Sequence, residues 1–162
     1  MKESALDIAK YIVSKCSKEG NPITNMELQR ILYFCQKYFL QVYERPMFDD
    51  EFEAWPFGPC LPSIHYFFGV FGANPIQCVY EGIEIGKAKL PKIHRITREK
   101  RNQNTWEIPG LNEYQGDAWE MAYKKGNHTL IPKEWIENEL MIPNQKQRNK
   151  FFANLWRKEK ER

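Results

Sequence analysis

The heptapeptide EAWPFGP, at positions 53–59, restricts the fold more than any other stretch of this sequence. Pro56 lacks a backbone donor and its ring keeps Trp55 away from helical backbone angles, so no regular helix is expected to run through this point. Gly58 permits a positive φ immediately before a second proline. The chain is therefore predicted to turn sharply here, with the large side chains of Trp55 and Phe57 as the anchors of a rigid corner.

The sequence on either side of this corner indicates which elements it joins. Apolar residues that lie two or four positions apart predict a short, half-buried strand near positions 51–55. After the corner, Pro62 is well placed in the first turn of a helix. This helix is predicted over 61–71, and Gly72 can close it. The corner is thus interpreted as a connection from a strand to a helix.

Two helices are predicted before the corner, and the second has the stronger start signal. The first has apolar residues at helical spacing from Ala5 to Cys16 and ends before Gly20. In the second, Thr24 and Glu27 have the spacing of a capping box. Its apolar stripe is too broad for a helix with one solvent-exposed side. This pattern predicts the central helix of the core. The stripe comprises Leu28, Ile31, Leu32, Cys35, Tyr38, Phe39 and Val42.

The second half of the chain has weaker signals. Alternating apolar residues predict a strand or a bulged hairpin over 76–85. Helices are predicted over 90–102, over 117–124 and from Pro132 onward, and the stretch 102–114 is predicted to be a loop. Together these elements predict a compact, predominantly α-helical α+β domain with a small two- or three-stranded sheet.

Composition excludes several classes of protein. With 162 residues, of which 42% are hydrophobic and 14% aromatic, the chain suits one packed core and not a disordered segment. No apolar run approaches the length that is needed to cross a bilayer. The first residues, MKESALDIAK, do not resemble a signal peptide. A cytoplasmic location without membrane association is therefore expected.

Residues that could perform catalysis or bind a metal occur without the partners that such chemistry needs. The four cysteines lie far apart and are interpreted as reduced, buried thiols. A nucleophilic site made of Cys60 or Cys35 with His65 lacks an orienting residue. The acidic residues at 49–53 lack the spacing of a calcium loop. The sequence contains no P-loop, GxGxxG or HExxH motif. No catalytic residue, no metal and no cofactor are predicted.

The net charge of +3 is unevenly distributed along the chain. Positions 143–162 contain seven Lys or Arg residues and two Glu residues, so a basic extension follows a domain that is predicted over 1–142. Within the extension, Phe151, Phe152 and Trp156 fall on one side at helical spacing, with cations around them. Three interpretations fit this segment: a helix packed on its own domain, a helix presented to a partner's groove, or a nucleic-acid contact.

Four segments, taken in order, resemble the Panacea domain of SocA-like antitoxins, a family of bacterial and phage-associated proteins. The segments are ALDIAKYIV, PITNMELQRILYFCQKYFL, FDDEFEAWPFGPCLPSIHYFFGVFG and DAWEMAYKKGNHTLIPKEWIENEL. The most specific part is the pattern PIT-N-x-x-L-Q-x-x-L-Y-F followed by EAW-x-x-GP. The resemblance covers positions 5–142 and is weak from 77 to 114. This chain also departs from the family at Ala118, where Pro is usual.

The resemblance implies an antitoxin that is not an enzyme and that neutralises a cognate toxin, encoded by a neighbouring gene, through direct protein–protein binding. Candidate partner-binding residues are aromatic, because interfaces depend on apolar and aromatic anchors. They are Trp55 and Phe57 in the corner and Phe151, Phe152 and Trp156 in the extension. Two alternatives stay open: a nucleic-acid-binding regulator that uses the basic extension, and a proteolytic adaptor that delivers a toxin to a AAA+ protease. A metal-free hydrolase comes third.

Overall fold

The structure is a computed structural model that describes residues 3–101, 114, 117–139 and 157. Its helices are mostly short, and one, η1, is a 3₁₀ helix. The elements in chain order are α1 (Ala5–Lys18), α2 (Asn25–Tyr43), β1 (Glu53–Trp55), β2 (Gly58–Cys60), α3 (Pro62–Phe67), η1 (Gly69–Phe71), α4 (Leu90–Arg101), α6 (Ala118–Lys125), β3 (Thr129–Leu130) and α7 (Lys133–Asn138). The predicted fold class, predominantly α-helical α+β with a small sheet, is confirmed.

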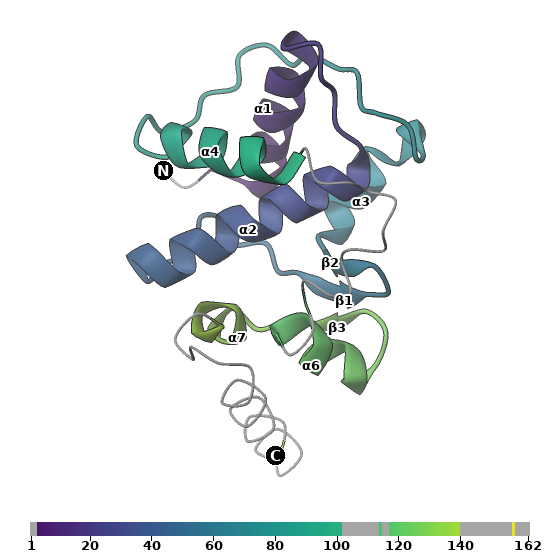
Figure 1. The fold of residues 1–162 in the computed structure, drawn as a ribbon, viewed down its shortest axis with the longest axis vertical. Helices are drawn as coiled ribbons and strands as arrows, with labels where there is room; N and C mark the ends of the chain where they lie inside the picture. Colours follow the sequence, from purple (N-terminus) through teal and green to yellow (C-terminus); the bar gives the residue numbers. More distant parts are fainter. Residues whose placement is uncertain (1–2, 102–113, 115–116, 140–156, 158–162) are drawn as a thin grey trace.

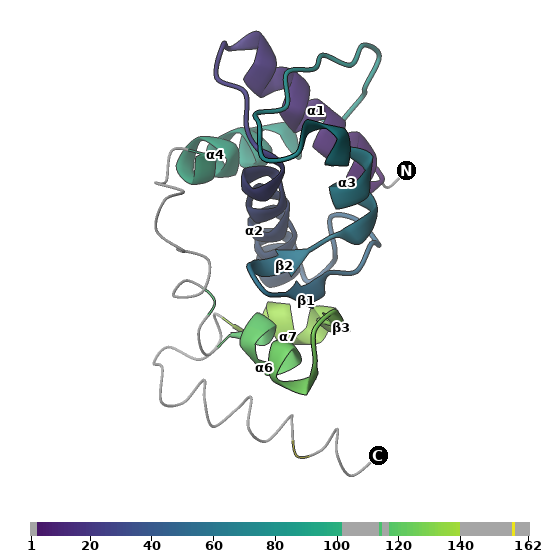
Figure 2. The ribbon, with the colours of Figure 1, turned by 90° about the vertical axis from the view of Figure 1, so that its right-hand side faces the viewer.

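Helix α2 occupies the centre of the molecule (Figure 1). Helices α1, α3 and α4 surround it on one side; on the other side α7 packs directly on α2, and the small sheet lies between α2 and α6 (Figures 1 and 2). The sheet is antiparallel with strand order β2-β1-β3, so the third strand comes from the distant C-terminal half. This pairing attaches the C-terminal half to the rest of the fold.

The two N-terminal helices form because their starts and their inner sides are encoded locally. In α1, the hydroxyl of Ser4 accepts a hydrogen bond from the backbone N–H of Asp7 at 3.1 Å. In α2, Thr24 and Glu27 form the complete predicted capping box. The apolar stripe of α2 is buried in the core except for Tyr38, which is half-buried, and for the C-terminal end, where Val42 is 52% exposed. The prediction that Val42 belongs to the core is therefore wrong, because the helix extends beyond its neighbours there.

The predicted corner is in fact a tight β-hairpin, so the interpretation as a direct strand-to-helix connection is wrong. Strand β1 pairs with β2, and Trp55 stands opposite Gly58. Pro59 is tolerated within β2 because β2 is an edge strand. Gly58 has a φ of 121°, and a Cβ atom there would lie 2.8 Å from the Tyr114 ring. Both the backbone angle and the close contact therefore require glycine at this position.

Downstream of the hairpin, the predicted helix over 61–71 and the predicted strands over 76–85 both differ from the structure. The helix divides into α3 and η1, which ends at Gly72 with a φ of 56°. The segment 76–85 contains no strand. Its backbone instead bonds to α1: Tyr80 N–H donates to the Ser14 hydroxyl at 2.8 Å, and Cys78 N–H donates to the Ser17 hydroxyl at 3.1 Å. Serine side chains thus replace the partner strand.

The later helices agree with the predictions within a few residues. The helix predicted over 90–102 is α4, the one over 117–124 is α6, and the one that begins near Pro132 is α7. The predicted loop and the basic extension fall outside the described residues, apart from Tyr114 and Arg157. The division into a domain over 1–142 and an extension over 143–162 stays a prediction. Among the helices that the structure describes, none is long and apolar enough to span a bilayer.

Candidate protein-binding face

The side chain of Trp55 is the centre of a cluster of rings contributed by three segments. Its indole is 6% exposed and stacks on the His128 ring, with 4.2 Å between the ring centroids and 14° between the planes. The His65 ring meets the indole edge-on at 5.0 Å. Phe57 and Tyr66 each have ring centroids 6.2 Å from it. We call Trp55, Phe57, His65, Tyr66 and His128 the aromatic face.

Hydrogen bonds hold Trp55 in this position from two directions. Its indole N–H donates to a carboxylate oxygen of Glu53 at 2.9 Å, and its backbone carbonyl accepts the indole N–H of Trp119 at 2.7 Å. The second bond joins β1 to α6. The prediction that Trp55 and Phe57 both anchor the corner is consistent with this packing for Trp55, whereas Phe57 is 45% exposed. Trp55 lies at the base of the aromatic face, where other residues cover most of its surface.

The rim of the aromatic face is exposed to an extent that is unusual for large apolar side chains. Phe57 is 45% exposed and Tyr66 is 68% exposed. Two further apolar residues on α3 and η1 are exposed as well, Phe67 at 44% and Val70 at 88%. Contiguous apolar surface of this kind commonly marks an interaction site, whereas single exposed apolar residues need no explanation.

His128 has a strained backbone that presents its ring to the cluster. Its φ is 68°, in the left-handed region that non-glycine residues rarely occupy. Its backbone N–H donates to the carbonyl of Ala54 at 2.8 Å, which holds the residue against β1. Strain of this kind persists only where the surroundings enforce it, and it is frequent at functional sites.

Buried amides on α2 decide where the hairpin ends and α3 begins. The carboxamide of Gln29 accepts the backbone N–H of Leu61 at 2.7 Å and donates to the carbonyl of the same residue at 3.2 Å. One turn earlier, the side-chain amide of Asn25 donates to the carbonyl of His65 at 3.0 Å. These two residues belong to the PIT-N-x-x-L-Q pattern noted above. Their structural role is to position the segment that carries Tyr66.

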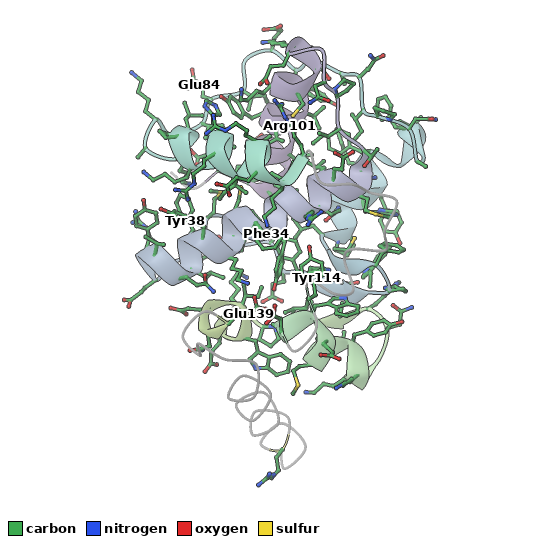
Figure 3. The ribbon with its side chains drawn as sticks, in the orientation of Figure 1. Phe34, Tyr38, Glu84, Arg101, Tyr114 and Glu139 are labelled. Atoms are coloured by element: carbon green, nitrogen blue, oxygen red, sulfur yellow. The ribbon has the colours of Figure 1, made fainter. Side chains whose placement is uncertain are left out.

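A buried carboxylate joins the C-terminal elements to α2. Glu139 has no exposed surface and accepts the Tyr33 hydroxyl and the Ala118 backbone N–H, each at 2.8 Å. It also forms an ion pair of 2.6 Å with Lys37. Burial, with the charge of Glu139 second, raises the pKa of Tyr33 well above its usual value. Tyr33 therefore stays a hydrogen-bond donor to Glu139, which lies below α2 in Figure 3.

The cysteines and acidic residues have structural explanations. All four cysteines are free thiols, and Cys16, Cys35 and Cys60 are buried as predicted, whereas Cys78 is only half-buried. Burial raises the pKa of Cys35 and of Cys60 to about 12. Protonated thiols are poor nucleophiles and poor metal ligands. Within the acidic stretch, Asp50 accepts the Ala5 N–H at 3.3 Å, at the start of α1. In the part of the chain that the structure describes, no three His, Cys, Asp or Glu residues could hold a metal ion together.

Of the five predicted partner-binding residues, the structure brings two together. Trp55 and Phe57 lie on the aromatic face, whereas Phe151, Phe152 and Trp156 lie outside the described residues. The sequence analysis did not identify Tyr66 or His128 as members. The run IHYFFGVF carried a signal for Tyr66, because it has more apolar residues than one buried side of a short helix can hold. No local signal identifies His128, which reaches the face through strand pairing.

Comparisons with known proteins place the chain in a family. The family model for the antitoxin SocA-like Panacea domain matches residues 28–138, from within α2 to the end of α7. Antitoxin SocA of Caulobacter vibrioides (strain NA1000 / CB15N) is 33% identical over 100 residues, which is 62% of this chain. The chain spans about half the length of that curated relative, since the match covers 51% of it. No solved structure gave a significant match. The chain therefore belongs to the family of SocA-like antitoxins that is defined by the Panacea domain.

Proposed function

We propose that this protein is the antitoxin of a toxin–antitoxin pair and that it neutralises its toxin in a direct, non-catalytic complex. The family match over residues 28–138 carries this proposal. The match includes the hairpin, α3 and His128 just before β3, which together contribute all the residues of the aromatic face. We assign toxin binding to that face, with Phe57 and Tyr66 as its exposed anchors.

The physical character of the aromatic face suits a protein partner. Binding energy in protein interfaces is concentrated in a few residues, and Trp and Tyr are enriched among them. Phe57 and Tyr66 project from a base made rigid by Trp55, so less side-chain freedom is lost when a partner binds. Phe57 and Tyr66 also expose apolar ring surface, whose removal from water is favourable at about 25 cal/mol per Å².

Growth rescue tests the proposal. Cells that express the product of the adjacent gene should stop growing, co-expression of this protein should restore growth, and the two proteins should co-purify. Phe57→Ala and Tyr66→Ala should abolish rescue with little change in melting temperature, because both side chains are partly exposed. Tyr43→Ala is the matched control, since Tyr43 is 39% exposed at the end of α2 and lies outside the aromatic face.

The Trp55→Ala variant distinguishes the stabilising role of Trp55, at the base of the aromatic face, from the binding role of Phe57 and Tyr66 at its rim. The indole is 6% exposed, so its removal should lower the free energy of unfolding by about 3–5 kcal/mol. Rescue retained by both rim variants would remove the aromatic face from the proposal and leave the antitoxin role intact. A neighbouring gene without toxicity, or the absence of any co-purifying toxin, would overturn the antitoxin role itself.

The same growth-rescue assay tests the aromatic residues of the extension. Phe152→Glu and Trp156→Glu should lower the melting temperature if the extension packs on its own domain. They should leave it unchanged and abolish rescue if the extension is presented to the toxin. Unchanged melting with full rescue would exclude both roles.

A further inference from the structure

Helix α4 and the residues just before it form the most basic part of the described structure. Positions 87–101 contain seven Lys or Arg residues and one Glu residue. The net charge of the domain hides this segment, because acidic residues elsewhere in the domain offset its cations, and the basic character was therefore predicted for the extension alone. In the folded protein those cations are gathered on one helix.

Six of the seven cations of α4 and its lead-in divide into an inner and an outer set, and the seventh, Lys100, lies 3.8 Å from the centroid of the Phe34 ring. Ile93, Ile96 and Thr97 are buried against the core and define the inner side of the helix. At its two ends, Lys89 forms an ion pair with Glu3, and Arg101 forms one with Glu19 at 2.9 Å. These two cations hold α4 against the N-terminal segment and α1 and have a structural role (Figure 3).

The outer set consists of the exposed Lys87, just before the helix, and of the half-buried Lys92 and the exposed Arg95 and Arg98 on α4. We call these four residues the basic face. Arg95 and Arg98 are one turn apart and exposed. The guanidinium of Arg95 lies over the Tyr38 ring, 4.9 Å from its centroid, and its side chain is 47% exposed. Tyr38 thus restricts Arg95 while leaving it accessible. An acidic residue, Glu99, lies beside the basic face on α4, with its Oε1 atom 4.0 Å from Nε of Arg95.

The chemistry of the basic face favours a phosphate backbone over a protein partner. The core of a protein interface is depleted in charged residues and needs aromatic or apolar anchors. The basic face presents charged side chains, and the exposed aromatic residues of the described structure lie in the hairpin, on α3 and, as Tyr43, at the C-terminal end of α2. Cations in a row with preorganised arginines suit phosphate, because guanidinium groups bind phosphate oxygens bidentately and each contact releases counterions.

We propose that the outer side of α4 binds the phosphate backbone of duplex DNA without reading its base sequence. In Figure 2, α2 lies between α4 and α3, so the basic face and the aromatic face are on different sides of the molecule. The two surfaces can therefore be occupied together. The proposal is independent of toxin binding, and each can fail without the other.

Fluorescence anisotropy with a random-sequence 24-base-pair DNA duplex tests the proposal on the full chain. The triple variant Lys92→Gln, Arg95→Gln, Arg98→Gln should reduce the slope of log affinity against log salt by about 2.7, because each lost phosphate contact accounts for about 0.9. The matched control Lys18→Gln, Arg45→Gln, Lys124→Gln removes the same charge from exposed positions outside the basic face. It should retain most of the slope.

Two further variants and one further probe make the outcome decisive. The single variant Arg98→Gln replaces the triple variant if the latter does not fold. It changes one exposed side chain and should reduce the slope by about 0.9. If the triple variant and its control lose the same amount of salt-dependence slope, the proposal is wrong, because net charge alone would then explain the binding of DNA. It would also fail if Lys146→Gln, Arg148→Gln, Lys150→Gln abolished binding while the α4 variant bound normally. Binding of a polyglutamate peptide without binding of DNA would assign the basic face to an acidic protein and contradict the proposal.

Discussion

Replacement of Gln29 by methionine tests whether a buried amide positions the aromatic face. In the structure this carboxamide makes two hydrogen bonds to the backbone of Leu61, as a neighbouring strand would. Gln29 is 6% exposed and Leu61 is 1% exposed, so water cannot easily replace either bond. Methionine has a similar length and flexibility and fills nearly the same volume. The substitution therefore removes the hydrogen bonds with little change in packing.

The expected cost follows from the two backbone groups that lose their partner. A buried, unsatisfied donor or acceptor costs about 1–3 kcal/mol, so Gln29→Met should lower the free energy of unfolding by about 2–6 kcal/mol. A domain of this size loses about 2–4 °C in melting temperature for each kcal/mol. The expected decrease in melting temperature is therefore about 10 °C.

Chemical denaturation and hydrogen exchange check this prediction. The matched control is Gln41→Met, since Gln41 makes one half-buried hydrogen bond to the Ile136 carbonyl at 3.1 Å and should cost about 0.5–1.5 kcal/mol. The amide of Leu61 should exchange faster in Gln29→Met than in the control. If Gln29→Met is no less stable than Gln41→Met, the amide does not hold the hairpin and α3 in place, and this account of the motif residue is wrong.

Three further predictions concern buried and charged groups. Glu139→Gln should destabilise the fold by about 3 kcal/mol, because the charge of Lys37 loses its counter-ion; adding Lys37→Met should recover part of this loss in denaturant unfolding. Burial raises the pKa of Glu3, but hydrogen bonds from a lysine and from a backbone N–H outweigh it and lower the pKa to about 2. Glu3→Gln should therefore reduce stability above about pH 4.5, and its stability curve should converge with that of the parent as the pH falls toward 2. Cys35 and Cys60, with pKa values of about 12, should react with iodoacetamide at pH 8 far more slowly in the native than in the unfolded protein.

The elements that the sequence predicted well are those whose signals lie within a few positions of one another. The capping box of Thr24 and Glu27 spans three positions, and the apolar stripe of α2 repeats at each turn. Such signals act before any tertiary contact forms, because a helix satisfies its own backbone hydrogen bonds. The helices α1, α2, α4, α6 and α7, and the family membership that depends on the order of their motifs, could therefore be predicted from sequence.

The hairpin, the third strand and the aromatic face depended on partners that lie far away in the chain. An alternating apolar segment predicts a strand, yet residues 76–80 bond to serine hydroxyls on α1. Conversely, the two residues of β3 carry almost no periodicity and become a strand because they pair with β1, where the flanking N–H groups of His128 and Ile131 donate to the carbonyls of Ala54 and Phe52. The same pairing brings His128 against Trp55, more than 70 positions earlier in the sequence. Local patterns determine which segments can be helical, whereas a strand or a shared surface exists only where the folded chain supplies the other half of each contact.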